Sequence, residues 1–353
     1  MAYNSSSSDP SNLTMTSGPT SNGPDRPLPV GEAIFIVLVV VSTFIINVLV
    51  ILVITRNASL RNITGYFIIA LACSDLLYGA CFSFSIPSVI YREWIFGDFF
   101  CSIDGYLYNV TYHNSIHSFV FVTIDRYIAI TRPLHYHQIM TRNKCFLIIA
   151  FGWAVSFAAV SPTIFGFGSF AYRPDVYWCG IAWGNDWRYT VYCTCIFMPD
   201  LFAILFCYYS IWRISYEHSQ GMQEHQAFHE DMKENRNKAL RTLIVMGVSF
   251  LNGWFPYLLS MLYAGISPYP IPYSVNFAMG WVSTSNSFWD SFLYILSSQP
   301  MKQGFKKLFA PCCRKLCSCC ADKNDPIRNG ISLDVVDKHS KHSTTNNHIN
   351  IDV

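Results

Sequence analysis

The chain alternates between long apolar segments and shorter polar ones. Each apolar segment has roughly 20 or more residues, the length that an α-helix needs to cross about 30 Å of hydrocarbon. The fourth and seventh segments are less apolar than the first, so their limits are less well defined. We expect an all-α membrane protein, a seven-transmembrane helix bundle. The predicted spans are residues 32–55, 65–91, 101–130, 145–168, 189–213, 239–264 and 273–297.

The composition supports a membrane protein. Of the 353 residues, 52% are apolar or aromatic and 13% are charged, whereas soluble domains average about 25% charged residues. The net charge of +2 is too small to suggest binding to nucleic acid. Residues 1–29 are rich in Ser, Asn, Pro and Gly and contain no apolar run. We therefore expect no cleavable signal peptide, and the first span itself should direct insertion.

Lysine and arginine residues lie mainly on one side of the predicted spans. They gather in the loops after spans one, three and five and in the tail, and positive residues in short loops mark the cytosolic side. We expect a plasma-membrane protein with its N-terminus outside the cell. The opposite side carries Arg26, Arg92, Arg173 and Arg188.

This orientation divides the chain into four parts. Residues 1–30 form an extracellular tail, 31–298 the transmembrane domain, 299–311 a membrane-surface helix, and 312–353 a cytosolic tail with a cysteine cluster. Two glycosylation sequons begin at Asn4 and Asn12 on the outer side.

The cysteines fall into groups by compartment. Cys101 and Cys179 both lie on the predicted outer side, where a disulfide can form and persist. A bond between them would tie the outer end of span three to the loop after span four. The alternative is two free thiols.

A second group of cysteines follows an amphipathic stretch at 301–309. Phe305, Leu308 and Phe309 can share one face of a short helix on the inner leaflet, which contacts membrane lipid. Palmitoylation at Cys312 and Cys313 suits this position. A zinc cluster is the alternative, but the cysteine spacing is too tight for a convincing site.

Ionisable residues inside a membrane usually mark a functional site, and this chain has few. Asp75 lies midway along span two and Asp290 lies in span seven. The triplet Asp125-Arg126-Tyr127 closes span three.

Together with other motifs, these residues resemble the pattern of the rhodopsin-like (class A) G protein-coupled receptors, on separate predicted helices and in the family's order. Within the family, the chain is similar to amine-type and neighbouring orphan receptors. Opsins carry a retinal-binding lysine in span seven, and residues 273–299 contain none. The matching positions are Asn47, Leu71 to Asp75, Trp94-x-Phe-Gly97, Asp125-Arg126-Tyr127, Trp153, Pro199, Phe250 and Trp254-Phe-Pro256.

The resemblance implies a switch that contacts a heterotrimeric G protein, and arrestin and receptor kinases as further partners. Arg126 would be held by Asp125 at rest and released toward the G protein when span six moves outward. Arg236 falls where many relatives carry an acid that restrains this arginine, so we expect elevated basal activity. The switch positions are Asp125, Arg126, Tyr127, Leu134 and Tyr294.

The resemblance also implies an allosteric sodium ion at mid-membrane, and otherwise no cofactor. Carboxylate, hydroxyl and amide oxygens suit a hard cation. The alternative is a water-filled polar network with one aspartate protonated. The sodium positions are Asp75, Ser115, Asn286, Ser287 and Asp290.

Two positions depart from the family pattern. Ser291 replaces the proline that normally kinks span seven, and serine bends a helix less reliably. Cys207 stands where relatives have a tyrosine that receives the arginine, so one of its tyrosine neighbours is expected to take that part.

The outer half of the bundle should bind an extracellular small molecule or peptide. Amine receptors carry an aspartate where this chain has Tyr108, so an amine ligand anchored by Asp104 is an alternative. Trp178 or Ile181, tethered by Cys179, could enter the cavity and support basal signalling. The expected ligand residues are Asp104, Tyr108, Asn109, Tyr112, Tyr192, Trp254, Tyr257, Leu258, Met261, Trp281 and Thr284.

Two other classes of protein are less well supported. A transporter would show internal repeats and interrupted helix pairs in corresponding halves, and the sequence has neither. An enzyme would need a nucleophile motif or a metal-ligand spacing within the spans, and we expect no catalytic residues.

Overall fold

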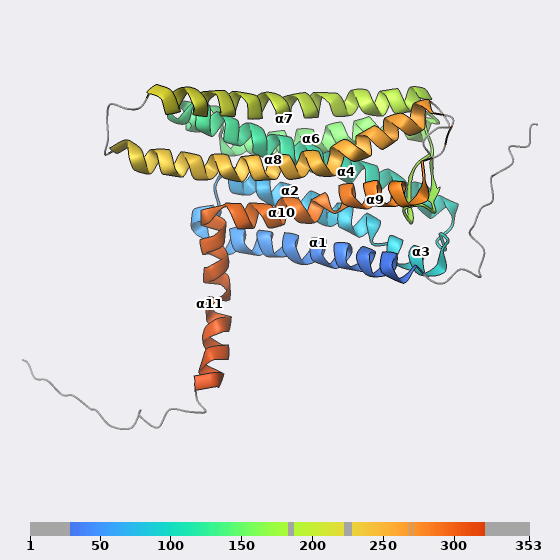
Figure 1. Cartoon of the computed structure of the whole chain (residues 1–353), viewed down its shortest axis with the longest axis horizontal. Helices are drawn as coiled ribbons and strands as arrows, with labels where there is room; N and C mark the ends of the chain where they lie inside the picture. Colours follow the sequence, from blue (N-terminus) through green and yellow to red (C-terminus); the bar gives the residue numbers. More distant parts are fainter. Residues whose placement is uncertain (1–28, 183–186, 222–227, 268, 270, 322–353) are drawn as a thin grey trace, which may run out of the picture. The chain divides into compact units, whose positions relative to one another are not determined.

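The computed structural model describes residues 29–182, 187–221, 228–267, 269 and 271–321. Within them, seven helical spans lie side by side as a bundle, as the sequence predicts (Figure 1). Two of the spans are each built from two helices. The spans are α1 (Val30–Arg56), α2 with α3 (Ile63–Phe82 and Ser85–Tyr91), α4 (Asp98–Thr131), α6 (Arg142–Val160), α7 (Trp187–Gly221), α8 (Phe228–Ile266), and α9 with α10 (Tyr273–Thr284 and Asn286–Ser297).

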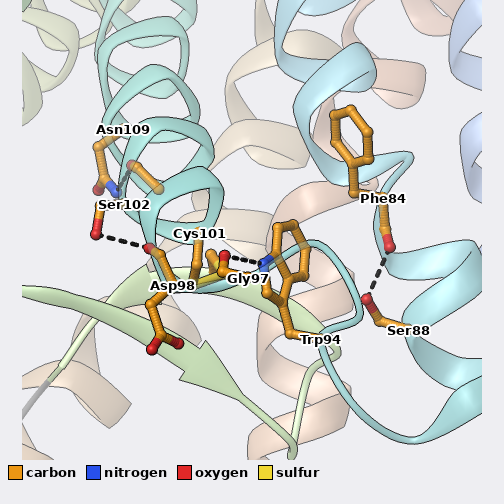
Figure 2. The surroundings of a disulfide bond; sticks show 10 residues. Phe84, Ser88, Trp94, Gly97, Asp98, Cys101, Ser102 and Asn109 are labelled. Atoms are coloured by element: carbon orange, nitrogen blue, oxygen red, sulfur yellow. Dashed lines mark hydrogen bonds between the residues drawn. A yellow bond between two sulfur atoms is a disulfide. The ribbon is translucent and has the colours of Figure 1, made fainter.

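Local sequence signals fix where several helices begin. The Asn62 side chain caps α2 by accepting a hydrogen bond from the Gly65 amide at 2.9 Å. Gly97 precedes α4 with φ +82°, a conformation that side chains disfavour. The Trp94 indole donates to the Gly97 carbonyl at 2.9 Å (Figure 2). The Trp94-x-Phe-Gly97 motif therefore builds the turn that starts α4.

The fourth span starts and ends earlier than predicted, whereas the seventh keeps its predicted limits and is broken inside them. The helix α6 ends at Val160 and continues as the 3₁₀ helix η3 (Ser161–Phe165), because Pro162 has no amide hydrogen to donate. The seventh span is interrupted at Ser285. Ser291, which replaces the family's proline, lies within the regular helix α10. The break therefore lies at Ser285 and not at the position of that proline.

Five of the spans are apolar and long enough to cross a membrane by length and composition: Val30–Arg56, Ile63–Tyr91, Arg142–Phe165, Trp187–Arg213 and Ile244–Ala264. The helix α4 and the α9–α10 pair carry more polar residues. Many of these are buried, including Asn114 on α4 and Asp290 on α10. Polar side chains that face the bundle interior escape contact with lipid.

The helix α4 is central to the packing. It contacts α2, α6, α7 and α8, while α1 packs against α2 and α10. Phe119 of α4 and Phe250 of α8 stack with ring centroids 4.5 Å apart and planes at 7°. These apolar contacts hold the helices that carry the polar sites described below.

The segment predicted as a membrane-surface helix forms α11 (Gln299–Ala321), which continues beyond its predicted limit at residue 311. Met301 is fully buried, and Phe305 and Leu308 pack on the apolar cluster around Val53 and Leu60 of the bundle. An apolar face thus holds the start of α11. The predicted acylation sites Cys312 and Cys313 lie in α11, where side chains are outside the described part. The sequons at Asn4 and Asn12 also lie outside the described residues.

The sequence did not predict the two short strands between α6 and α7. The strands β1 (Phe170–Arg173) and β2 (Trp178–Ile181) pair antiparallel, with Tyr172 opposite Cys179. The turn closes through the Tyr177 amide, which donates to the Arg173 carbonyl at 2.8 Å. All four residues of β2 are buried, so this hairpin is part of the core at this end of the bundle.

Candidate functional site

A disulfide between Cys101 and Cys179 joins β2 to the first turn of α4, as predicted. The two Cα atoms are 5.3 Å apart, within the usual range for a disulfide. Figure 2 shows Cys101 beside Asp98 and Gly97, at the very start of the helix. The bond fixes the hairpin over the bundle, and we call this the disulfide end.

The hairpin places Trp178 inside the bundle. Its side chain is 1% exposed and stacks on Tyr108 of α4, with ring centroids 5.5 Å apart. It also meets Trp281 of α9 edge-on at 5.3 Å, and the Trp281 indole donates to the Val176 carbonyl at 3.1 Å. Side chains of the loop therefore fill the space between α4 and α9.

A glycine on α9 makes this approach feasible. A Cβ atom on Gly280 would lie 2.9 Å from both the Trp178 ring and the Val176 side chain, closer than real contacts allow. Any larger residue there would push the hairpin outward. The position of the Trp178 side chain therefore depends on the sequence of α9, where Gly280 leaves room for it, as well as on the sequence of the loop.

Polar contacts close the rim above Trp178. Tyr177 and Tyr273 each donate to Oε2 of Glu32 at 2.8 Å. Burial raises the pKa of Tyr177 to about 12, which keeps its phenol protonated as a donor. The first turn of α1 is thereby linked to the loop and to the start of α9.

Below the hairpin, a cavity of about 30 Å³ lies among α4, α7 and α8, and we call it the inner cavity. Seven of the eleven expected ligand residues line it, so the structure brings most of that set together. The full lining is Tyr108, Asn109, Tyr112, His113, Ile181, Cys193, Thr194, Phe197, Trp254, Tyr257, Leu258 and Met261.

Four of the expected ligand residues lie elsewhere. The Tyr192 hydroxyl donates to the Ala159 carbonyl at 2.9 Å, toward α6. Thr284 lies within 3.3 Å of the Tyr78 hydroxyl, and Trp281 is covered by Trp178. Asp104 is 3% exposed and does not border the inner cavity. The structure therefore offers no support for Asp104 as an amine anchor there.

Sequence reasoning missed His113 and three residues of α7 that line the inner cavity: Cys193, Thr194 and Phe197. The spacing held a signal, because His113 follows Asn109 by four positions and so shares its helical face. His117, one turn further, is already engaged. Its ring lies 3.0 Å from the Ser156 hydroxyl and 3.3 Å from a carboxylate oxygen of Asp200.

The expected sodium residues gather in the buried interior of the bundle, on three helices. The Ser115 hydroxyl donates to Oδ1 of Asp75 at 2.6 Å, and the Asn286 amide donates to Oδ2 of Asp290 at 2.9 Å. Both aspartates are buried. The second oxygen of each has no hydrogen-bond partner among the described residues. Two buried carboxylates with open oxygens fit a hard cation.

Ser291 has a specific partner in place of the missing proline. Its hydroxyl donates to Oδ1 of Asn47 at 2.5 Å, and the Asn47 amide donates to the Ser287 carbonyl at 3.0 Å. Asn47 thus ties α1 to two successive turns of α10. The substitution replaces a kink by a polar contact between helices.

At the other end of the bundle, Asp125 is fully buried and holds three partners. Arg126 donates to its Oδ2 at 2.7 Å, and Thr64 donates to the same oxygen at 2.7 Å. Tyr136, in the short helix α5 (Tyr136–Ile139), donates to Oδ1 at 2.6 Å. Burial and the carboxylate raise the pKa of Tyr136 to about 12, so it remains a donor.

Arg126 and Tyr294 line a cavity of about 330 Å³ between α2, α4, α8 and α10. Leu134, in the 3₁₀ helix η2 (Pro133–His135), is 90% exposed beside this end. Tyr127 turns toward α7, with its ring 6.0 Å from Phe206. Arg126, Tyr294 and Leu134 thus face open space, while Tyr127 packs on α7.

Two positions near Arg126 depart from the family pattern, Arg236 and Cys207, and the structure describes the side chains around only the second. Arg236 lies in α8, in a part where side chains are not described. Of the tyrosines after Cys207, Tyr209 is 59% exposed, whereas Tyr208 packs in the core against Gly247 of α8. Tyr208 is therefore the neighbour that faces the bundle.

Comparison with known proteins agrees with this arrangement. Residues 46–294 match the family model "7 transmembrane receptor (rhodopsin family)". The fold is similar to that of squid rhodopsin, with a TM-score of 0.70 at 22% identity, over 85% of this chain and 89% of that one.

Several curated receptors are similar over most of their length. G-protein coupled receptor 52 from Mus musculus is 27% identical, over 81% of this chain and 83% of its own. Probable G-protein coupled receptor 21 from Homo sapiens is 28% identical, over 84% and 87%. Melatonin receptor type 1C from Gallus gallus is 25% identical, over 81% and 84%.

Proposed function

The chain belongs to the rhodopsin family of seven-transmembrane receptors and signals through G proteins, and we propose that it does so without an added ligand. The observation that carries this proposal is Trp178, which fills the space between α4 and α9 from within the chain. A side chain that occupies part of the ligand site can bias the receptor as a bound ligand would.

The proposal includes an orientation. The disulfide end faces the cell exterior at the plasma membrane, and the end with Asp125 and Arg126 faces the cytosol. The excess of lysine and arginine in the loops near Arg126 supports this orientation. Arrestin and receptor kinases are then expected partners at the same cytosolic surface, and no catalytic residue is expected.

Arg126 is the proposed contact with the G protein. At rest it pairs with Asp125, whose other partners are Thr64 and Tyr136. An outward shift of α8 would widen the cavity that Arg126 and Tyr294 line. A terminal segment of the G protein would then enter this cavity and contact Arg126. Arg236 at the foot of α8 adds positive charge instead of an acid, which disfavours the closed state.

Basal signalling gives the test of this proposal. Cells that express the receptor should show second-messenger levels above those of cells with empty vector, at matched surface expression and without added ligand. Each G protein class is measured in turn. Output equal to empty vector for every class would overturn the proposal of ligand-independent signalling.

Sodium at the mid-membrane cluster is a second part of the proposal. Asp75, Ser115, Asn286, Ser287 and Asp290 would hold the ion, and the open carboxylate oxygens support this fit. A bound cation would offset the cost of two buried carboxylates.

Asp75→Asn should remove the effect of sodium on stability. Sodium chloride, compared with choline chloride at equal ionic strength, should raise the melting temperature of the purified wild type by a few degrees. A sodium concentration ten times the dissociation constant would stabilise the folded receptor by about 1.4 kcal/mol. Asp98→Asn, at an exposed position, is the matched control. A sodium shift that persists in Asp75→Asn would rule out this site, and no shift in wild type would favour a water-filled network.

A further inference from the structure

The inner cavity has an uncharged wall. Among the described residues that line it there is no aspartate, glutamate, lysine or arginine. A charged ligand group would lose its hydration there without gaining a counter-charge, which costs far more than burying a neutral polar group. Trp254 and Tyr257 attract cations through their ring faces, but this attraction is smaller than the lost hydration of an ammonium ion.

His113 brings close to this wall a side-chain nitrogen that lacks a hydrogen-bond partner among the described residues. Its side chain borders the inner cavity and the residue is 7% exposed. Its Nδ1 atom is buried and has no hydrogen-bond partner in the part of the chain that the structure describes. A buried polar atom without a partner is costly, and a ligand that supplies the missing bond recovers that cost.

Two other polar groups around the inner cavity already have partners. The Asn109 amide donates to the Gly105 carbonyl at 2.7 Å, and the Thr194 hydroxyl donates to the Thr190 carbonyl at 2.9 Å. Each bond stays within its own helix. His113, unlike these two residues, has a buried polar atom that a ligand can satisfy without breaking a bond that the structure describes.

Ile181 separates the inner cavity from a larger one. An outer cavity of about 570 Å³ lies between the hairpin and the α8–α9 connection, and Ile181 lines both cavities. The inner cavity, at about 30 Å³, holds a few atoms at most. A ligand ring needs more room than this, and a movement of the Ile181 side chain would join the two spaces.

We propose that the inner cavity binds an uncharged aromatic ligand group, whose hydroxyl or amide bonds to Nδ1 of His113 after Ile181 moves aside. This ligand class rests on the receptor function proposed above. His113 then discriminates ligands by hydrogen bonding, and the uncharged wall excludes amines and carboxylates.

Three probes with the same phenol ring test the proposal on purified full-length receptor in lipid nanodiscs. N-acetyltyramine is neutral, tyramine is a cation, and 3-(4-hydroxyphenyl)propionate is an anion. Saturation-transfer NMR and isothermal titration measure their binding. N-acetyltyramine should bind more tightly than either charged probe. His113→Phe should weaken its binding about five- to tenfold, the worth of one neutral hydrogen bond.

Ile181→Ala should act in the opposite direction and tighten binding severalfold, because the ring no longer has to displace a side chain. Ile164→Ala, at a 66% exposed position, is the control and should leave binding unchanged. The proposal is overturned if no probe binds, if tyramine or the propionate binds as tightly as N-acetyltyramine, or if His113→Phe binds like wild type.

The same nanodiscs are assayed for ligand-free guanine nucleotide exchange on purified G proteins. If the receptor stimulates guanine nucleotide exchange but the probes do not bind as predicted, the proposed ligand class is rejected and the proposed receptor function stands. Absence of exchange with every G protein class would reject ligand-independent signalling itself, whatever the probes do.

Discussion

Trp178→Ala should destabilise the receptor and lower its basal signalling. Removing a buried tryptophan costs about 3–5 kcal/mol in folding free energy, and Trp178 is 1% exposed between Tyr108 and Trp281. The same change empties the space that the loop fills, so ligand-free output should fall toward that of empty vector. Thermal unfolding of purified receptor and second-messenger output at matched surface expression are the two measurements.

Trp187→Ala is the matched control, because Trp187 is 66% exposed and should tolerate the change. Trp178→Phe keeps an aromatic ring in the same seat and should fold even if the alanine variant does not, with reduced basal output. Unchanged basal output in a folded Trp178→Phe and in Ile181→Ala would refute a role for the loop in signalling.

Asp125→Asn should raise basal signalling about tenfold. The change removes the negative charge that pairs with Arg126 at 2.7 Å. Hydrogen bonds to charged groups contribute about 1.5–3 kcal/mol, and each 1.4 kcal/mol shifts an equilibrium about tenfold. The free arginine would then favour the open state. Output is measured without ligand and normalised to surface expression.

Tyr136→Phe should produce a smaller rise, since it removes one hydrogen bond to Asp125 and leaves the ion pair. Asp98→Asn, an exposed acid in the first turn of the same helix, should have no effect. Output of Asp125→Asn at or below the wild-type level would show that the Asp125–Arg126 pair does not restrain the receptor.

Much of the bundle could be predicted from the sequence, because membrane thickness sets span length directly. The disulfide was also predictable, since Cys101 and Cys179 lie on the same side of the membrane. The end of α6 at Val160 was missed because Pro162 sits among apolar residues that extend the hydropathy signal. The hairpin was missed because its strands are only four residues long and neither alternates regularly: β2 is buried throughout, while β1 is half-buried except at the exposed Ala171.

The sites were predicted unevenly for a physical reason. Asp75 and Arg126 belong to motifs within single helices, and the bond from Arg126 to Asp125 follows directly from one of them. The bond from Ser115 to Asp75 joins two helices and follows only once the family's helix order is assumed. The inner cavity depends on how α4, α7 and the hairpin meet. Trp281 faces the cavity by helical position, yet Trp178 covers it, and no pattern within α9 shows that contact. His113 borders the cavity only because α7 approaches that side of α4.

Guanine nucleotide exchange in a reconstituted system tests the central claim most directly. Wild-type receptor and Arg126→Gln are placed in nanodiscs with purified heterotrimeric G proteins of each class and a non-hydrolysable GTP analogue, with no ligand added. We predict that the wild type accelerates uptake of the analogue by at least one class and that Arg126→Gln falls to the receptor-free rate. Equal rates for the two receptors, or no acceleration of any class, would contradict the account.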